Sequence, residues 1–134
     1  MITLGNTSIR CVLAPGHTYG TMAFFFHATA GETARYVGYW GGVGFLTVYG
    51  GFCRDYGLPV GKHLRMAESI QKLRQEPVEL MLGNHPPQNC TLEKRTWMWE
   101  HPGENPFVNP AGWTEFLDTV ETRLAEFVAL GYGD

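Results

Sequence analysis

The stretch Ala14-Pro15-Gly16-His17-Thr18-Tyr19-Gly20 decides how this chain is interpreted. It follows the apolar run 9–13, and its Pro-Gly pair ends that predicted strand in a tight turn. The histidine is therefore held at a strand end, with little conformational freedom left to lose, which suits a metal ligand. His17 is our first candidate zinc ligand.

A second histidine occupies a comparable place later in the chain. The apolar run 78–82 suits a strand buried between layers, and it is followed by Gly83-Asn84-His85-Pro86. His85 thus also follows a strand, in a turn that contains glycine and proline. The other three histidines lack this context, and we interpret them as surface or hydrogen-bonded side chains: His27, His63 and His101.

Together, these two turns resemble the metal-ligand turns of the metallo-β-lactamase superfamily. The resemblance covers nearly all of the chain but only the C-terminal half of such a domain. It is most like the subclass B3 branch, because Trp40-Gly41-Gly42 stands where many members place an aspartate that bridges the two metal ions. The turn Pro106-Phe107-Val108, which precedes the final helix, also looks like that branch. The His-x-His-x-Asp-His signature, which belongs to the family's first half, does not occur in this sequence.

The resemblance implies a fold and an activity. The fold would be α/β, half of an αββα sandwich, with one mixed β-sheet and helices packed on one face, as a single domain over residues 1–134. The activity would be zinc-dependent hydrolysis of an amide, lactone or thioester by metal-bound hydroxide, with two zinc ions in the complete site. His17 and His85 would be metal ligands, and no catalytic side chain is identified.

The resemblance also bears on the substrate. Subclass B3 enzymes often present serines directly after the strand that corresponds to residues 35–40, where they hold the carboxylate of the β-lactam. This chain has Gly41, Gly42 and Val43 there, which puts β-lactam turnover in doubt. Trp40 would form an apolar wall for a small-molecule substrate. Aromatic residues beside glycine are as often plain core packing, and that alternative stays open.

Hydrophobic periodicity favours an α/β layer without reference to any family. Short strands are predicted at 2–4, 9–13, 22–27 and 35–40, separated by glycine-rich turns. Spacings of three and four residues predict an amphipathic helix within 58–75, and residues 91–99 are a candidate for a short helix. A longer helix follows, with Asn109 as N-cap, Pro110 at the first helical position and Gly131 at the end.

Composition restricts the class of protein. The 134 residues are 44% hydrophobic and 17% charged with a formal net charge of −3, which is typical of one globular domain without the basic surplus of a nucleic-acid binder. The 3 cysteines are odd in number and widely separated, so we expect reduced thiols and a cytoplasmic protein. We find no signal peptide and no stretch long enough to span a membrane.

Half of a sandwich would expose the sheet face that its other half normally covers, and such a face predicts association. Three arrangements stay open: a fragment of a longer enzyme, a separate chain that supplies the N-terminal half, or a homodimer. In a two-fold dimer, His17 and His85 of both copies would approach one another as a four-histidine site. The alternative function is a non-catalytic metal-binding or assembly module that keeps the fold.

Overall fold

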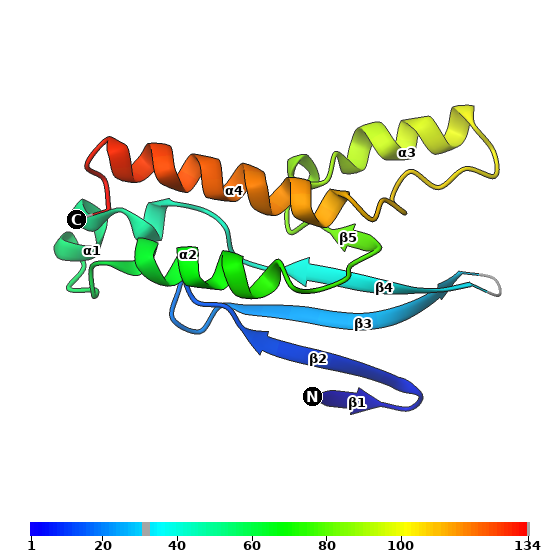
Figure 1. The fold of residues 1–134 in the computed structure, drawn as a ribbon, viewed down its shortest axis with the longest axis horizontal. Coiled ribbons are helices and arrows are strands. Elements are labelled where there is room, and N and C mark those ends of the chain that lie inside the picture. Colours follow the sequence, from blue (N-terminus) through cyan, green and yellow to red (C-terminus); the bar gives the residue numbers. More distant parts are fainter. Residues whose placement is uncertain (31–32, 134) are drawn as a thin grey trace.

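The computed structural model of the protein describes residues 1–30 and 33–133. Five strands form one sheet in the order β1-β2-β3-β4-β5 (Figure 1): Ile2–Leu4, Thr7–Leu13, Met22–Ala30, Thr33–Trp40 and Leu80–Leu82. The first four strands pair antiparallel with their neighbours, whereas β4 and β5 pair in parallel. The single mixed sheet predicted from the sequence is confirmed.

Within the described residues, four α-helices and two 3-10 helices lie between and after these strands. In chain order they are η1 (Leu46–Val48), α1 (Gly50–Asp55), α2 (Lys62–Leu73), η2 (Pro86–Gln88), α3 (Thr91–Glu100) and α4 (Gly112–Ala129). The two long helices, α2 and α4, lie side by side over the same sheet (Figure 1). Periodicity predicted α2, α3 and α4, but it gave no sign of η1 or α1.

The core lies between this helix pair and the sheet. Phe25 of β3 meets the Trp113 ring of α4 edge to face, with ring centroids 5.8 Å apart, and both side chains are 1% exposed. Met66, Ile70 and Leu73 of α2 are completely buried beside them. Removing this apolar surface from water at about 25 cal/mol per Å² is the main term that holds the helices on the sheet.

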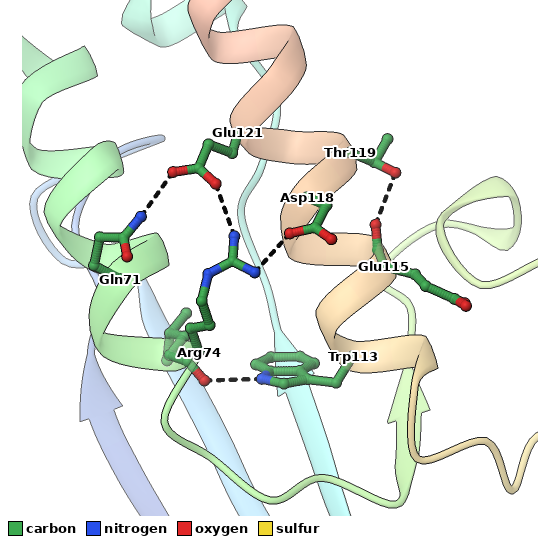
Figure 2. Close-up of polar contacts among 8 residues, drawn as sticks. Gln71, Arg74, Trp113, Glu115, Asp118, Thr119 and Glu121 are labelled. Atoms are coloured by element: carbon green, nitrogen blue, oxygen red, sulfur yellow. Dashed lines mark hydrogen bonds and ion pairs between the residues drawn. The ribbon is translucent and has the colours of Figure 1, made fainter.

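Polar contacts fix how α4 lies over α2, as Figure 2 shows. The Arg74 guanidinium donates to Asp118 at 2.6 Å and to Glu121 at 2.7 Å. The Trp113 indole donates to the buried carbonyl oxygen of Leu73 at 2.9 Å. Because the carboxylates are largely exposed, the ion pairs add little free energy, and their effect is to set the register of the two helices.

Two predicted boundaries differ from the structure. Helix α4 begins at Gly112, two residues after the predicted first helical position Pro110. The side chain of Asn109 nevertheless accepts the N–H of Ala111 at 3.1 Å, which is the kind of bond that an N-cap side chain makes. Strand β5 is shorter than the predicted run because the N–H of Val78 is used in a local turn with Glu76, at 2.9 Å.

The opposite face of the sheet carries no long helix. The strand register places apolar side chains there that are half-buried or exposed, and we call this set the open face: Leu13, Phe24, Phe26, Tyr39 and Leu82. Leu13 is 52% exposed and Leu82 is 38% exposed. The predicted helix cover on a single face is thus confirmed. Within the described ranges, none of the helices has the length and apolarity that a membrane-spanning segment needs.

Candidate metal centre

The parallel pairing of β4 and β5 brings the carboxyl ends of both strands to the same edge of the sheet. The glycine loop 41–44 follows β4, and the turn with His85 follows β5. The His17 turn follows β2 and reaches the same edge. A cavity of about 610 Å³ opens there, and both His17 and His85 line it. The two candidate ligands, which are far apart in the sequence, thus face a common space.

Hydrogen bonds fix the tautomer of His17. Its Nδ1 lies 2.8 Å from the carbonyl oxygen of Gly44, which can only accept, so Nδ1 carries the ring proton. The hydroxyl of Thr47 donates its own proton to the backbone carbonyl oxygen of His17 at 2.5 Å. Its oxygen lies 2.9 Å from Nδ1 and can therefore accept the same ring proton. The Nε2 atom is left with its lone pair, which is the arrangement that metal-binding histidines usually show.

The glycines after β4 allow the backbone to pass close to this imidazole. A methyl group on Gly42 would stand 3.0 Å from the Cβ of His17 and 3.2 Å from its Cδ2, and one on Gly44 would stand 3.4 Å from its Cε1. Any larger side chain at position 42 would therefore push the ring away. Glycine at positions 42 and 44 thus has a concrete cause, which is the close packing of His17.

His85 is held through its backbone. The side-chain oxygen of Gln88 accepts the N–H of Asn84 at 2.5 Å and that of His85 at 3.1 Å. The Asn84 side chain in turn donates to the carbonyl oxygen of Gly41 at 2.8 Å and accepts the Tyr39 hydroxyl at 2.6 Å. The His85 side chain is exposed and lines the cavity, and it forms a capping box with Gln88 at the start of η2.

The described residues supply only part of a zinc site. Within 1–30 and 33–133, no three or more histidine, cysteine, aspartate or glutamate side chains are grouped to hold a metal ion. Zinc sites in proteins normally have three or four protein ligands. The unbonded Nε2 of His17 and the exposed imidazole of His85 fit an imidazole-binding metal in kind, but the remaining ligands would have to come from outside this part of the chain.

The structure corrects the prediction that Trp40 forms a substrate wall. Trp40 is 1% exposed, and its indole donates to the carbonyl oxygen of Ala14 at 3.4 Å. Side chains alternate along a strand, and the pairing of Trp40 with Ala23 puts its ring on the face that the helices cover. Trp40 is a core residue, and the phenylalanines that do line the cavity are Phe107 and Phe116.

The remaining histidines lie outside the cavity. His27 packs against the ring of Tyr36 with centroids 5.1 Å apart, and His101 bonds through Nδ1 to the carbonyl oxygen of Trp97 at 3.0 Å. His63 packs against Gly133, and its Nδ1 is buried without a hydrogen-bond partner in the described residues. The geometry therefore singles out the two histidines that follow strand ends.

The cavity carries more positive than negative charge. Lys94 and Arg123 line it together with one carboxylate, that of Glu115. The Lys94 ammonium lies 5.5 Å from the ring centre of Phe107, and the Arg123 guanidinium lies 5.3 Å from that of Phe45. Neither cation forms an ion pair within the described residues. An anionic group entering the cavity would meet two unpaired cations.

Sequence reasoning missed the residues that hold the two histidines in place. Asn84 stands directly before His85, and a polar residue at the end of an apolar run was the available signal for it. Thr47 lies in a segment with no hydrophobic periodicity, 30 residues after His17, so nothing in the sequence linked the two. Both contacts depend on the tertiary fold.

Known proteins match this chain in structure but not in sequence. No protein-family model and no curated protein sequence matches it. The metallo-β-lactamase BJP-1 of Bradyrhizobium japonicum, described as subclass B3, superposes with a TM-score of 0.74 and 21% identity, over 96% of this chain and 47% of that one. The FEZ-1 metallo-β-lactamase of Legionella gormanii superposes with a TM-score of 0.79 and 21% identity, over 95% of this chain and 47% of that one.

A third structure agrees with these two. MEM-A1, a subclass B3 metallo-β-lactamase from a soil metagenome library, gives a TM-score of 0.81 at 16% identity, over 97% of this chain and 49% of that one. This chain thus spans about half the length of the solved structures that it matches. At such identities the likeness shows the fold alone, and it confirms the predicted half of a metallo-β-lactamase fold, most similar to the B3 branch.

Proposed function

We propose that this chain is the C-terminal half of a zinc-dependent hydrolase of the metallo-β-lactamase kind. The observation that carries the proposal is the pair His17 and His85, which face one cavity from two strand-end turns. The Nδ1 of His17 is already committed to Gly44, so its Nε2 presents a lone pair. In this proposal both imidazoles are zinc ligands, and further ligands come from a second half.

The chemistry would be hydrolysis of an activated carbonyl compound such as an amide, lactone or thioester. When bound, zinc activates water as a nucleophile and polarises the carbonyl group. The cavity of about 610 Å³ is in the range of sites for small molecules. Within it, Lys94 and Arg123 would orient a substrate that carries a negative charge, and Phe107 would contact its apolar part.

A missing half would cover the open face. That face exposes Leu13 and Leu82, and chains of the same fold are about twice as long as this one. We propose that a separate chain or an additional segment packs against it and completes the metal site. A homodimer that brings four histidines together is the second arrangement, and its mass in solution distinguishes it.

A non-catalytic metal-binding or assembly module is the second candidate function. The observation in its favour is that the described residues supply only two ligands, His17 and His85. Such a module would bind metal weakly and hydrolyse nothing, even with its partner present.

The deciding experiment measures zinc per chain by plasma mass spectrometry on samples whose mass is fixed by light scattering. Because two imidazoles are an incomplete site, we expect zinc in the wild type where the measured mass shows an assembly that supplies further ligands, and its loss in both His17→Ala and His85→Ala. His101→Ala is the matched control, because His101 lies outside the cavity and should keep wild-type zinc. Zinc that survives both substitutions would contradict the proposed ligands. Chelator-sensitive hydrolysis of a thioester or a chromogenic cephalosporin then separates the hydrolase from the module.

A further inference from the structure

Lys62, the first residue of α2, is unusually buried for a lysine. Only 4% of it is exposed, and its ammonium group donates to the carbonyl oxygen of Thr47 at 2.9 Å. It forms no ion pair within residues 1–30 and 33–133. Lysine is almost never fully buried unless a carboxylate pairs with it. The position of Lys62 therefore needs a reason other than stability.

Three separate costs attach to this side chain. Its charge is removed from water, which disfavours the folded state. An ammonium group has three N–H donors, and the described residues provide one acceptor for them. The residue also opens a helix, where the helix dipole disfavours a positive charge. Residues that break several local rules at once tend to stand at functional sites.

The contact of Lys62 leads to the candidate metal centre. The Thr47 carbonyl that accepts the ammonium also accepts the buried thiol of Cys53 at 3.3 Å, so this peptide group is held from two sides. The carbonyl belongs to η1, and the same residue's hydroxyl contacts both the Nδ1 and the backbone oxygen of His17. A continuous path of hydrogen bonds thus runs from α2 through Thr47 to the His17 ring.

We propose that Lys62 is a positioning residue for His17. By anchoring η1, it holds the Thr47 hydroxyl where, together with the Gly44 carbonyl, it keeps the proton of the His17 ring on Nδ1. The lone pair of Nε2 then faces the cavity. The inference rests on the proposed function, because the tautomer matters only if Nε2 binds metal. Its test needs neither metal nor hydrolysis, so the two proposals can fail separately.

The test follows the His17 tautomer by imidazole ¹⁵N NMR in the metal-free chain, with thermal unfolding in parallel. In the wild type we expect the Nδ1–H form of His17 to predominate. Lys62→Met should shift His17 towards a mixture of both tautomers while the melting temperature stays equal or rises, because the buried charge is gone. If Lys62 had a purely structural role, its replacement would not change the tautomer of His17 while the melting temperature stays equal or rises.

Lys72→Met is the matched control. Lys72 lies on the same helix, and its ammonium also donates to a backbone carbonyl oxygen, that of Leu13, at 2.9 Å. It is exposed and has no contact with Thr47, so its loss should leave the His17 resonances unchanged. Equal effects of the two substitutions on His17 would overturn the assignment to Lys62.

Two further results would overturn the proposal. One is a Lys62→Met chain with lowered stability and an unchanged His17 tautomer, since Lys62 would then serve packing alone. If this variant does not fold, Thr47→Val decides, because it removes the hydroxyl and retains the lysine. A wild-type tautomer in Thr47→Val would show that Gly44 suffices and that the path through Thr47 has no role.

Discussion

The hydroxyl of Tyr39 donates a hydrogen bond of 2.6 Å to the side-chain oxygen of Asn84, and so ties the end of β4 to the residue that precedes His85. The Asn84 amide closes the connection by donating to Gly41 at 2.8 Å. The position of His85 relative to the glycine loop is therefore set by one asparagine.

Asn84→Ala should loosen the His85 turn without unfolding the protein. We expect faster amide exchange at residues 83–85 and zinc binding that is weaker by about tenfold, equivalent to about 1.4 kcal/mol, the scale of one or two lost hydrogen bonds. Exchange measured by mass spectrometry and competition with a zinc chelator check the two effects. Tyr39→Phe should give a smaller change of the same kind.

Tyr56→Phe is the control for the tyrosine, because Tyr56 is 70% exposed and lies outside the cavity. Unchanged exchange at residues 83–85 in Asn84→Ala would mean that η2 alone holds the turn.

Gly42→Ala should displace His17. The added methyl would stand 3.0 Å from the Cβ of His17 and 3.1 Å from the Cγ2 of Thr21, closer than ordinary packing. Such overpacking costs about 1–3 kcal/mol. We expect a lower urea midpoint together with lost zinc binding. Gly20→Ala is the matched control, because a methyl there meets nothing within 4 Å. Full zinc binding by Gly42→Ala would refute the tight packing around this ring.

Trp113→Phe should test how α4 is held on α2. It removes the indole N–H and leaves the buried Leu73 carbonyl without this donor, which now lies at 2.9 Å. The Leu73 carbonyl keeps the N–H of Glu76 at 3.1 Å, so the substitution removes one hydrogen bond, which contributes about 0.5–1.5 kcal/mol, and the smaller ring adds a cavity. The free energy of unfolding in urea measures the loss. Trp99→Phe, at a position that is 69% exposed, should change it by less than about 0.5 kcal/mol.

The strand-end histidines were predictable because their surroundings are local. An apolar run that stops at Pro-Gly, or at Gly-Asn, identifies a strand end from a few adjacent residues. For Trp40, the sequence analysis left a substrate wall and plain core packing both open. The period of two along β4 was the better guide, since it places Trp40 two residues from Gly38, which faces Val78 under the helices. Thr47 and Lys62 could not be found, since only the tertiary fold brings them behind His17.

Acid should destabilise the chain partly through Glu79. The N–H of Tyr36 and, next in importance, the Arg35 guanidinium bond to this carboxylate at 2.9 Å each and lower its pKa. A carboxylate whose pKa is lower in the folded state stabilises the fold above its unfolded pKa, and the contribution disappears as the pH falls through the folded pKa. Melting temperatures from pH 7 down to pH 3 should therefore fall less steeply in Glu79→Gln than in the wild type.

Glu68→Gln is the control for this series, because Glu68 pairs on the surface with Arg65 of its own helix. If the melting temperature of Glu79→Gln fell with pH as steeply as that of the wild type, the acid sensitivity would come from other groups.

Charge in the cavity should select the substrate. If the proposed hydrolase is active, replacing both Lys94 and Arg123 by Met should lower kcat/KM for a thioester that bears a carboxylate by about fivefold to thirtyfold, with little change for its neutral amide analogue. Arg95→Met is the matched control, since Arg95 lies on the same helix as Lys94 with its guanidinium 4.6 Å from the Trp99 ring. Equal losses for both substrates would exclude recognition of charge.

The parallel pairing of β4 with β5 also determines when the candidate metal centre can exist. Strands β1 to β4 follow one another with short connections, so their contacts are local and should form early. Strand β5 can join only after the whole segment 41–79, including α2, has closed back onto β4. His17 and His85 are therefore brought to one cavity only after the strands β1 to β4 have paired. Metal uptake during refolding would then record the arrival of β5, and an ion bound at that moment would slow its departure.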